Sequence, residues 1–453
     1  MKKITIMGTG YVGLVTGVSL ARLGHKVICV GRNKDKIEAI NNGKSPFFEP
    51  GLDNLLVKLT KKGLLVATNN LKESVISSDF TIIAVGTPTV NNKIDLSEIR
   101  EASKQIGEAL GYIRKYHVVI IKSTVIPGTS ENVVKPILEE YSSKNVGKDF
   151  GLCMNPEFLR EGNALDDALD PDRIVIGQYD DKSGKEFAKI YKKYRCPIIF
   201  TNLKTAEMTK YASNALFATL ISFSNEIARV SEKATGVDVL DVWKGVHLDR
   251  RLSPVIGKTR IRPGMLSYIL SGCGYGGSCF PKDTKALANF ADELQEEAKL
   301  VKNVIEINST QPHRLIILLK DALSEIKNKR IAVLGLSFKP NTDDLRESAA
   351  FPVIEELLSG GAKVICHDPQ VYKKNIPEKL KSLPIVLVKT AKEAIMDSDA
   401  VLIITSWDEY IKLTPQSFKQ YMKTPIIIDG RRIYNKEKFK KAGIIYKGIG
   451  LGN

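Results

Sequence analysis

The first half of the chain alternates short apolar runs with longer stretches in which apolar residues recur at helical spacing. The runs are rich in β-branched residues, as expected of strands that are buried on both faces of a sheet. They lie at Ile4–Met7, Val27–Val30, Thr81–Val85, Val118–Ile121 and Ile174–Ile176, and helical patterns such as Gly13–Leu23 and Leu96–Leu110 lie between them. This alternation predicts βαβ units and therefore a doubly wound parallel sheet.

The last third of the chain repeats the same order of elements. The runs Arg330–Gly335 and Lys363–Cys366 mirror Lys3–Gly8 and Lys26–Cys29, and further apolar runs follow at Ala400–Ile404 and Pro425–Ile428. The predicted fold class is therefore α/β, with two Rossmann-like doubly wound parallel-sheet domains joined by a helical middle region.

A long helix is expected between the two domains. Residues 205–234 contain no Pro or Gly, and apolar residues recur close to helical spacing at Met208, Tyr211, Leu216, Leu220, Phe223, Ile227 and Val230. A helix of about 30 residues would be roughly 45 Å long, which suits a strut between domains, and its apolar stripe suits a dimer interface. Gly236 fits a C-cap, and residues 245–272 are expected to form a long loop. The predicted domains are 1–200 (dinucleotide-binding), 201–310 (helical, with the dimer interface) and 311–453 (second Rossmann-like domain).

Composition and charge narrow the class of protein. The chain has 453 residues, of which 43% are hydrophobic and 26% charged, and this is ordinary for a multidomain globular protein. The net charge of +16 attracts polyanions, so a nucleic-acid binder is one alternative. However, Lys and Arg are scattered along the whole chain, which favours a basic surface with sites for phosphate-bearing small molecules.

Localisation and metal content follow from what the sequence lacks. No apolar run approaches the length of a membrane span, and no signal peptide precedes the first predicted strand, so neither a membrane nor secretion is expected. The six Cys residues show no CxxC spacing and the five His residues show no metal-ligand spacing, so we expect no metal site and a reducing, cytoplasmic location.

A glycine motif predicts a dinucleotide site. Gly8-Thr9-Gly10-Tyr11-Val12-Gly13 directly follows the first predicted strand and precedes a helix. In this pattern the first Gly makes the turn, the second lets the backbone approach the pyrophosphate, and the third packs helix on strand. Gly31 and Arg32 stand where an acidic residue usually holds the adenosine ribose. Arg32 therefore either receives the 2′-phosphate of NADP, or it stacks on adenine or is solvated while NAD binds.

A second motif, Gly274 to Asp283, predicts a reactive thiol. Cys279 lies in a Gly-rich turn just before Pro281, which fits the first turn of a helix. The helix dipole and the charge of Lys282 favour the thiolate, and Asp283 lies four residues later on the same helical face. A carboxylate beside a nucleophile is typical of a reaction centre. The alternative for a lone Cys is a buried structural thiol.

Seven motifs together resemble the UDP-glucose/GDP-mannose dehydrogenase family over essentially the whole chain. They are GTGYVGL at 8–14, GTP at 86–88, STVIPGT at 123–129, NPEFLREG at 155–162, KYASNA at 210–215, GYGGSCFPKD at 274–283 and GLSFKPNTDDLRES at 335–348. Members of the family oxidise C6 of a nucleotide sugar from alcohol to carboxylate with two dinucleotides in succession. The resemblance implies NAD or NADP as cofactor, a nucleotide-sugar substrate, and a homodimer or higher oligomer.

The resemblance also assigns roles to single residues. Cys279 would be the nucleophile that captures the aldehyde and passes through a thioester. Asp283 and Glu157 would position or activate water, Thr124 would hydrogen-bond that water, and Lys210 with Asn214 would stabilise the alkoxide. The predicted cofactor contacts are Gly8, Gly10, Tyr11, Val12, Gly13, Arg32, Lys36, Thr87, Pro88, Thr124, Glu161 and Arg346. The predicted substrate contacts are Glu157, Phe158, Leu159, Lys210, Asn214, Arg251, Tyr268, Gly272, Gly276, Phe338, Lys339 and Arg431.

Departures from the family pattern leave the exact substrate open. The form of the Cys279 motif favours UDP-glucose, and GDP-mannose is the closest competitor. The chain is longer than is usual in the family at about 253–266, which weakens the assignment of Arg251 and Tyr268. Leu270 and Cys273 also differ from common family residues. A two-electron hydroxyacid-type dehydrogenase is a further alternative, but it needs neither Cys279 nor a second Rossmann-like domain.

Overall fold

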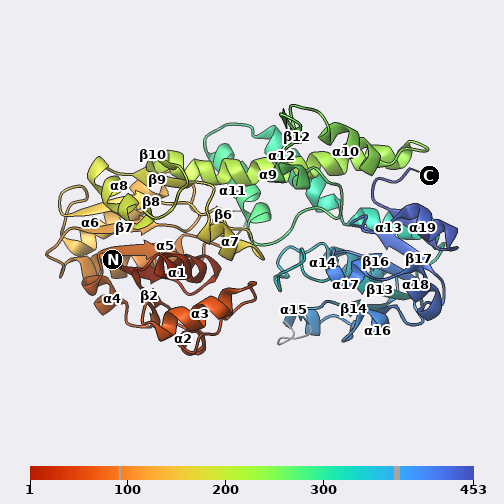
Figure 1. Ribbon diagram of the computed structural model, residues 1–453, viewed down its shortest axis with the longest axis horizontal. Coiled ribbons are helices and arrows are strands. Elements are labelled where there is room, and N and C mark those ends of the chain that lie inside the picture. The colour runs from red at the N-terminus through yellow and green to blue at the C-terminus, as the bar shows by residue number, and fades with distance from the viewer. Residues whose placement is uncertain (91–92, 372–377, 453) are drawn as a thin grey trace. The chain divides into compact units, whose positions relative to one another are not determined.

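The computed structural model describes residues 1–90, 93–371 and 378–452. The chain forms two compact units, Met1–Ser213 and a second one that begins at Asn214 (Figure 1). The boundary falls inside the helix α9 (Leu203–Lys233), which lies within two residues of the predicted 205–234. The predicted division into three domains at 200 and 310 stays a prediction.

The first unit contains an eight-stranded sheet with the order β10-β9-β8-β7-β4-β1-β2-β3. Its strands are β1 (Lys3–Met7), β2 (Lys26–Val30), β3 (Leu65–Thr68), β4 (Phe80–Ile83), β7 (His117–Ile121), β8 (Phe150–Met154), β9 (Ile174–Gln178) and β10 (Ile198–Asn202). All neighbouring strands are parallel except β8 and β9. The six strands from β3 to β8 have the strand order of a Rossmann fold.

Helices cover both faces of this sheet because its strands are apolar on both faces. They are α1 (Tyr11–Arg22), α2 (Lys34–Asn41), α3 (Leu52–Lys61), α4 (Leu71–Ser77), α5 (Ser97–Leu110), α6 (Lys135–Ser142), α7 (Ala164–Leu169) and α8 (Asp181–Ala188). Successive residues of β7 belong to two separate cores: Val118 and Ile120 pack with α1, and Val119 and Ile121 pack with α5. A short hairpin, β5 (Thr89–Val90) with β6 (Lys93–Ile94), precedes α5, and a π-helical turn (Ser130–Val134) precedes α6.

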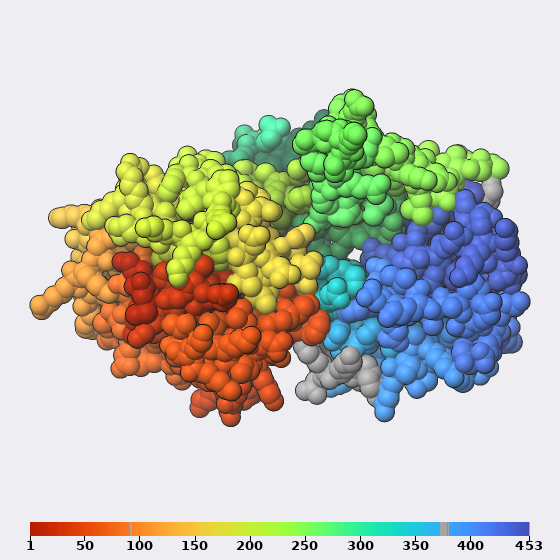
Figure 2. Space-filling model, in the orientation of Figure 1, coloured from red at the N-terminus to blue at the C-terminus, as the bar shows by residue number. Residues whose placement is uncertain are grey.

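The region 245–272 is more structured than the expected long loop. It contains the end of α10 (Val239–His247), a hairpin of β11 (Val255–Ile256) and β12 (Thr259–Arg260), and a 3₁₀ helix (Gly264–Tyr268). The expectation was wrong because Gly257-Lys258 between Val255-Ile256 and Thr259-Arg260 is a two-residue hairpin signal, and Gly257 adopts a φ of +60° at the turn. The hairpin projects from the molecular surface, and Ile256 at its tip is 66% exposed (Figure 2).

The second unit contains a six-stranded, fully parallel sheet with the order β15-β14-β13-β16-β17-β18, again that of a Rossmann fold. Its strands are β13 (Arg330–Leu334), β14 (Lys363–His367), β15 (Val386–Leu387), β16 (Ala400–Ile403), β17 (Ile426–Asp429) and β18 (Ile445–Gly448). Besides α10 and the part of α9 from Asn214 on, the helices of this unit are α11 (Phe280–Glu293), α12 (Lys299–Thr310), α13 (His313–Ala322), α14 (Ala350–Ser359), α15 (Glu378–Lys381), α16 (Ala391–Ile395), α17 (Asp408–Ile411), α18 (Pro415–Tyr421) and α19 (Lys436–Lys441).

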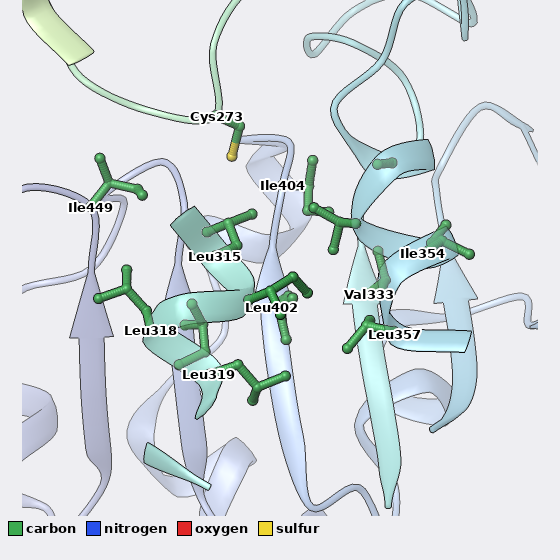
Figure 3. Packing of buried hydrophobic residues seen from close by; sticks show 14 of the residues in the cluster. Cys273, Leu315, Leu318, Leu319, Val333, Ile354, Leu357, Leu402, Ile404 and Ile449 are labelled. Atoms are coloured by element: carbon green, nitrogen blue, oxygen red, sulfur yellow. The ribbon is translucent and has the colours of Figure 1, made fainter. Parts of the chain in front are cut away.

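One core of the second unit extends to the loop before Cys279. Leu315 and Leu319 of α13 pack against Leu402 of β16, and the side chain of Cys273 lies at the margin of this cluster with its sulfur toward Leu315 (Figure 3). The Cys273 thiol donates to the carbonyl of Gly430 at 3.3 Å, and burial raises its pKa. Cys273 is therefore a small buried apolar anchor for the loop.

None of the described helices is both long enough and apolar enough to span a membrane. The described residues also contain no group of three or more His, Cys, Asp or Glu side chains arranged to hold a metal ion.

Candidate active site

In the glycine motif after β1, only one of the three glycines has room for a Cβ atom. A Cβ on Gly8 would lie 2.2 Å from the Ala84 carbonyl oxygen, and a Cβ on Gly13 would lie 2.2 Å from the Gly8 carbonyl oxygen. A Cβ on Gly10 would have nothing within 4 Å. Tyr11 and Val12 open α1, which has no side-chain N-cap. The turn therefore offers free backbone to a pyrophosphate at the N-terminus of a helix.

The segments 85–88 and 123–124, which contain predicted cofactor contacts, meet at the carboxyl ends of β4 and β7. The hydroxyl of Thr87 donates to the Thr124 carbonyl at 2.8 Å, and Ser123 donates to the carbonyl of Val85 at 2.7 Å. The Pro88 carbonyl accepts the amide of Asp95 at 2.8 Å, which closes the β5–β6 hairpin. Thr124 is half-buried. Ligands of open α/β sheets bind at this edge, so the position suits the predicted cofactor contacts.

Glu157 and Lys210 form a buried ion pair in the first unit. The Lys210 Nζ lies 2.9 Å from Glu157 Oε1, and the other carboxylate oxygen accepts the Leu159 amide at 2.6 Å. Burial opposes ionisation of Glu157, but the charge of Lys210 and the Leu159 hydrogen bond hold its pKa below the ordinary value. The Phe158 ring lies 5.6 Å from the Lys210 ammonium. The pair is thus held charged in a dry environment, as a proton-transfer or oxyanion site requires.

A second buried lysine lies close to this pair and was not predicted as a site residue. Lys122 donates to Asn155 Oδ1 at 2.9 Å, and Tyr191 donates to the same oxygen at 2.8 Å. Burial lowers the pKa of Lys122 to about 8, although the charge of Glu157 opposes this. Lys122 directly follows a predicted strand, and this position could have indicated a site residue, because ligands bind at the carboxyl ends of the strands.

Glu207 is another buried carboxylate that the sequence analysis did not single out. It accepts the Gly128 amide at 2.6 Å and both the amide and the hydroxyl of Ser130, at 2.8 and 2.6 Å. Burial raises its pKa to about 7 in spite of these donors. Glu207 lies three residues before Lys210 on α9, so it fixes the segment after Thr124 to the helix that carries Lys210. The sequence could have indicated Glu207, because this charged residue lies four residues before the apolar Tyr211 and therefore on the buried face of the predicted helix.

Glu49 links the glycine turn to the predicted substrate segment. The Tyr11 hydroxyl donates to Glu49, and the Glu49 carboxylate accepts the amides of Gly162 at 2.8 Å and Leu165 at 3.1 Å. Glu161, a predicted cofactor contact, directly precedes Gly162. No local pattern marks Glu49, because its partners lie far away in the sequence.

Cys279 lies at the N-cap of α11 in the second unit, as predicted. The amide of Asp283 donates to the Cys279 carbonyl at 2.9 Å, so the two residues lie one turn apart. The Ser278 hydroxyl lies 3.5 Å from the Cys279 sulfur. Cys279 is partly buried, and its position at the start of α11 places it at the positive end of the helix dipole.

The Asp283 carboxylate is held by two neighbours. Its side chain is 1% exposed, forms an ion pair with Lys282, and accepts the side-chain amide of Asn214 at 2.6 Å. Asn214 lies one helical turn after Lys210 on α9. The structure therefore brings Asn214, Asp283 and the start of the Cys279 helix together.

The loop before Cys279 meets the second Rossmann-like sheet. A Cβ on Gly272 would lie 3.2 Å from Nη1 of Arg431, whose side chain also donates to the carbonyls of Ile404 at 2.6 Å and Phe338 at 3.4 Å. A Cβ on Gly276 would lie 2.3 Å from the Glu347 carbonyl oxygen. Gly272, Gly276, Phe338 and Arg431 are therefore brought together, and Lys339 follows Phe338 with its ammonium 5.4 Å from that ring.

The other predicted residues have different surroundings. The Arg251 side chain is 89% exposed and pairs with Asp249. The Tyr268 ring stacks on Phe217 at 4.4 Å and lies 6.3 Å from the ring of Phe280, the residue after Cys279. The Arg346 side chain pairs with Asp344, although its carbonyl accepts the Gly277 amide at 2.8 Å. Arg32 and Lys36 are exposed near the start of α2.

Two Rossmann-like sheets and a glycine turn with open space at Gly10 are typical of a dinucleotide-dependent dehydrogenase. Three family models match the chain: those of the UDP-glucose/GDP-mannose dehydrogenase NAD binding domain at residues 2–195, central domain at 204–310 and UDP binding domain at 332–436. The chain belongs to this family, and it is an enzyme of an NAD-dependent oxidoreductase class.

Relatives of known name cover almost all of the chain. A UDP-glucose 6-dehydrogenase of Rhizobium meliloti is 40% identical in an alignment of 457 positions that covers 99% of this chain and 99% of its own. A GDP-mannose 6-dehydrogenase of Azotobacter vinelandii is 37% identical over 91% of this chain and 93% of its own. The structure of a UDP-glucose dehydrogenase from Pyrobaculum islandicum superposes with a TM-score of 0.88 at 35% identity, over 100% of this chain and 98% of that one. Overall identity therefore does not separate the two substrates.

Proposed function

We propose that this protein oxidises C6 of UDP-glucose to the carboxylate of UDP-glucuronate by two successive hydride transfers to NAD or NADP. When bound, the dinucleotide supplies the hydride acceptor. The observation that carries the proposal is the hydrogen bond of Asn214 to Asp283 on the helix that begins at Cys279. A cysteine at a helix start, one turn before a held carboxylate, suits covalent capture of an aldehyde.

The proposed reaction passes through an aldehyde and a thioester. The C6 hydroxyl loses a proton to a base and its carbon loses a hydride, which gives the aldehyde and one reduced dinucleotide. The Cys279 thiolate adds to the aldehyde carbon, and loss of a second hydride from that carbon to a second oxidised dinucleotide leaves a thioester. Water gives one proton to a base and attacks the thioester, the C–S bond breaks, and the carboxylate and the thiol are released.

The other site residues are proposed to have separate roles in this reaction. Lys210, kept charged beside Glu157, stabilises the alkoxide that forms at C6, with Asn214 as a second donor. Asp283 and Glu157 activate or position the hydrolytic water, and Thr124 holds it. The proposal requires both clusters to act on one carbon atom. Phe158, Leu159, Gly272, Gly276, Phe338, Lys339 and Arg431 are proposed to bind the nucleotide sugar.

The relative from Azotobacter vinelandii supports a second candidate, oxidation of GDP-mannose by the same chemistry. The hydroxyacid-type alternative is less favoured, because that reaction makes no use of Cys279 or of the second sheet.

The experiment is turnover of UDP-glucose and, separately, GDP-mannose, with the reduced dinucleotide counted per sugar consumed. Two equivalents from UDP-glucose, lost in Cys279→Ser, are expected. Cys196→Ser is the matched control, because Cys196 is also partly buried but lies in the other unit. One equivalent per sugar, or activity that survives Cys279→Ser, would refute covalent capture. Turnover of GDP-mannose alone would establish the second candidate.

We also propose a homodimer that forms through α9. Leu216, Phe223 and Val230 recur every seven residues and are 54%, 49% and 64% exposed. A stripe at this spacing suits packing against another helix. Sedimentation should show a dimer that Phe223→Glu dissociates, whereas the same change at Val90, which is 55% exposed, leaves it intact. A monomeric wild type would refute the interface.

A further inference from the structure

The end of β2 differs from the usual dinucleotide site. In most NAD-binding sheets an acidic residue there hydrogen-bonds the 2′-hydroxyl of the adenosine ribose. Here the position is Gly31, whose amide donates to the Thr68 carbonyl at 3.0 Å. Gly31 is not among the glycines with positive φ, so its backbone conformation does not require Gly.

Thr9 explains why position 31 lacks a side chain. A Cβ on Gly31 would lie 2.6 Å from Thr9 Oγ1 and 2.7 Å from Thr9 Cγ2, closer than real Cβ contacts. Thr9 is only 7% exposed and lies between Gly8 and Gly10 of the turn. The Thr9 side chain therefore occupies the space from which a carboxylate at position 31 would reach the ribose.

Arg32, the residue after Gly31, carries a positive charge where most NAD-binding sheets carry a negative one. Its side chain is 65% exposed, and its Nη1 lies 3.0 Å from Glu98 Oε1 on α5. Exposed ion pairs of this kind contribute little stability, so Arg32 exchanges Glu98 for a better anion at small cost. Lys34 and Lys36 are also exposed, and Asp35 is the single carboxylate between residues 31 and 37.

We propose that Arg32 forms a subsite for the 2′-phosphate of NADP, and that this protein binds NADP more tightly than NAD. The guanidinium takes a phosphate through two parallel hydrogen bonds, which a ribose hydroxyl does not offer. NAD finds no carboxylate at position 31 for its 2′-hydroxyl, because Thr9 excludes one. Glu98 competes with the phosphate for Arg32 and weakens the subsite. The inference rests on the proposed dinucleotide site at Gly8–Gly13.

The test is isothermal titration calorimetry of the full chain with NAD and with NADP, at low and moderate salt. The dissociation constant for NADP should be at least about tenfold lower than that for NAD and should rise more steeply with salt. Arg32→Ala should remove most of this difference by weakening NADP alone. Glu98→Gln should strengthen NADP, because it frees Arg32. Lys61→Ala, an exposed cation on α3, is the matched control and should change neither constant.

A double variant tests the role of Thr9. The double variant Thr9→Gly with Gly31→Asp has room for a carboxylate at position 31 and should bind NAD in preference to NADP. The single variant Gly31→Asp should lower the stability of the protein, because the new side chain collides with Thr9. Wild type that binds NAD as tightly as NADP, or an Arg32→Ala effect equal for both dinucleotides, would overturn the inference while leaving the proposed site intact. Binding of neither dinucleotide would instead refute the dinucleotide site itself.

Discussion

Lys210 and Glu157 form an ion pair, Nζ to Oε1 2.9 Å, in which the side chains are only 3% and 5% exposed. Lys210→Met leaves the carboxylate buried without its main partner. Removal of one member of a buried pair costs about 3–5 kcal/mol, so urea unfolding at pH 7 should show a loss of that order. Lys204→Met on the same helix removes an exposed pair with Glu131 and should cost less than about 1 kcal/mol.

The stability lost in Lys210→Met should depend on pH. Because the folded-state pKa of Glu157 lies below its ordinary value of 4.5, the pair stabilises the protein above that pH. This stabilisation is lost as the pH falls through the folded-state pKa, so the gap between wild type and variant should narrow in acid. Equal losses in Lys210→Met and Lys204→Met, or a gap that is constant down to acid pH, would contradict this reading.

Glu207 should produce the opposite pH dependence near neutrality. Burial raises its pKa to about 7, above the unfolded value of about 4.3. The folded protein therefore binds this proton more tightly, and the resulting stabilisation is complete below the unfolded pKa and lost as the pH rises to 7. Since Glu207→Gln does not titrate, the unfolding free energy of wild type minus that of the variant should fall by up to about 1.4 kcal/mol per pH unit between pH 4.5 and 7.

Urea unfolding of wild type and Glu207→Gln at several pH values between 4.5 and 8 measures this difference, which should level off above pH 7. Glu131→Gln is the control, because Glu131 forms an exposed pair next to the same segment. A difference that does not change with pH would show that Glu207 is ionised throughout this range.

The pattern of apolar runs along the chain predicted that there are two sheets, because strands that are buried on both faces of a sheet are continuous apolar runs. The same reasoning missed β3, β10, β15 and β18 as well as β8, whose sequence Phe-Gly-Leu-Cys-Met is poor in β-branched residues. It also could not give the reversed direction of β9. Strand direction depends on how the chain returns to the sheet, which no local pattern records.

The site was predictable where chemistry lies in a motif and not where it depends on tertiary contacts. Cys279 and Asp283 lie within one helical turn, so spacing alone paired them. Glu49 reaches Gly162 across 113 residues, and only the fold brings these two together. Arg32 was noticed in the sequence, but the reason for Gly31 beside it, the Thr9 side chain, became visible only in three dimensions.

Gly10 and Gly13 should respond differently to the same change. Gly10 has a φ of −80° and open space at its Cβ position, so Gly10→Ala should alter stability by less than about 0.5 kcal/mol. It should nevertheless weaken dinucleotide binding at least about tenfold, because the methyl group takes the place of the pyrophosphate. Gly13→Ala places a Cβ 2.2 Å from the Gly8 carbonyl oxygen and should destabilise the fold by about 1–3 kcal/mol. Thermal unfolding and calorimetric titration separate the two effects, and normal dinucleotide binding by Gly10→Ala would contradict the assignment.

Gly277 and Phe338 should be coupled in substrate binding. Gly277 has a φ of +81°, and a Cβ there would lie 2.7 Å from Cζ of the Phe338 ring, which is proposed to contact the nucleotide sugar. Gly277→Ala should cost about 1–3 kcal/mol of stability through backbone strain and should raise the KM for the sugar by displacing the ring. Gly264→Ala, with open space and no positive φ, is the matched control and should change neither quantity.

A second substitution separates the two causes in Gly277→Ala. Phe338→Leu in the same chain removes the ring atoms that meet the new methyl group, so it should recover the steric part of the stability loss and leave the part due to backbone strain. A double-mutant cycle in urea should therefore give a favourable coupling of about 0.5–3 kcal/mol. Additive losses would mean that the ring does not pack on Gly277 in solution, and Phe338 would then lose its proposed position beside the cysteine loop.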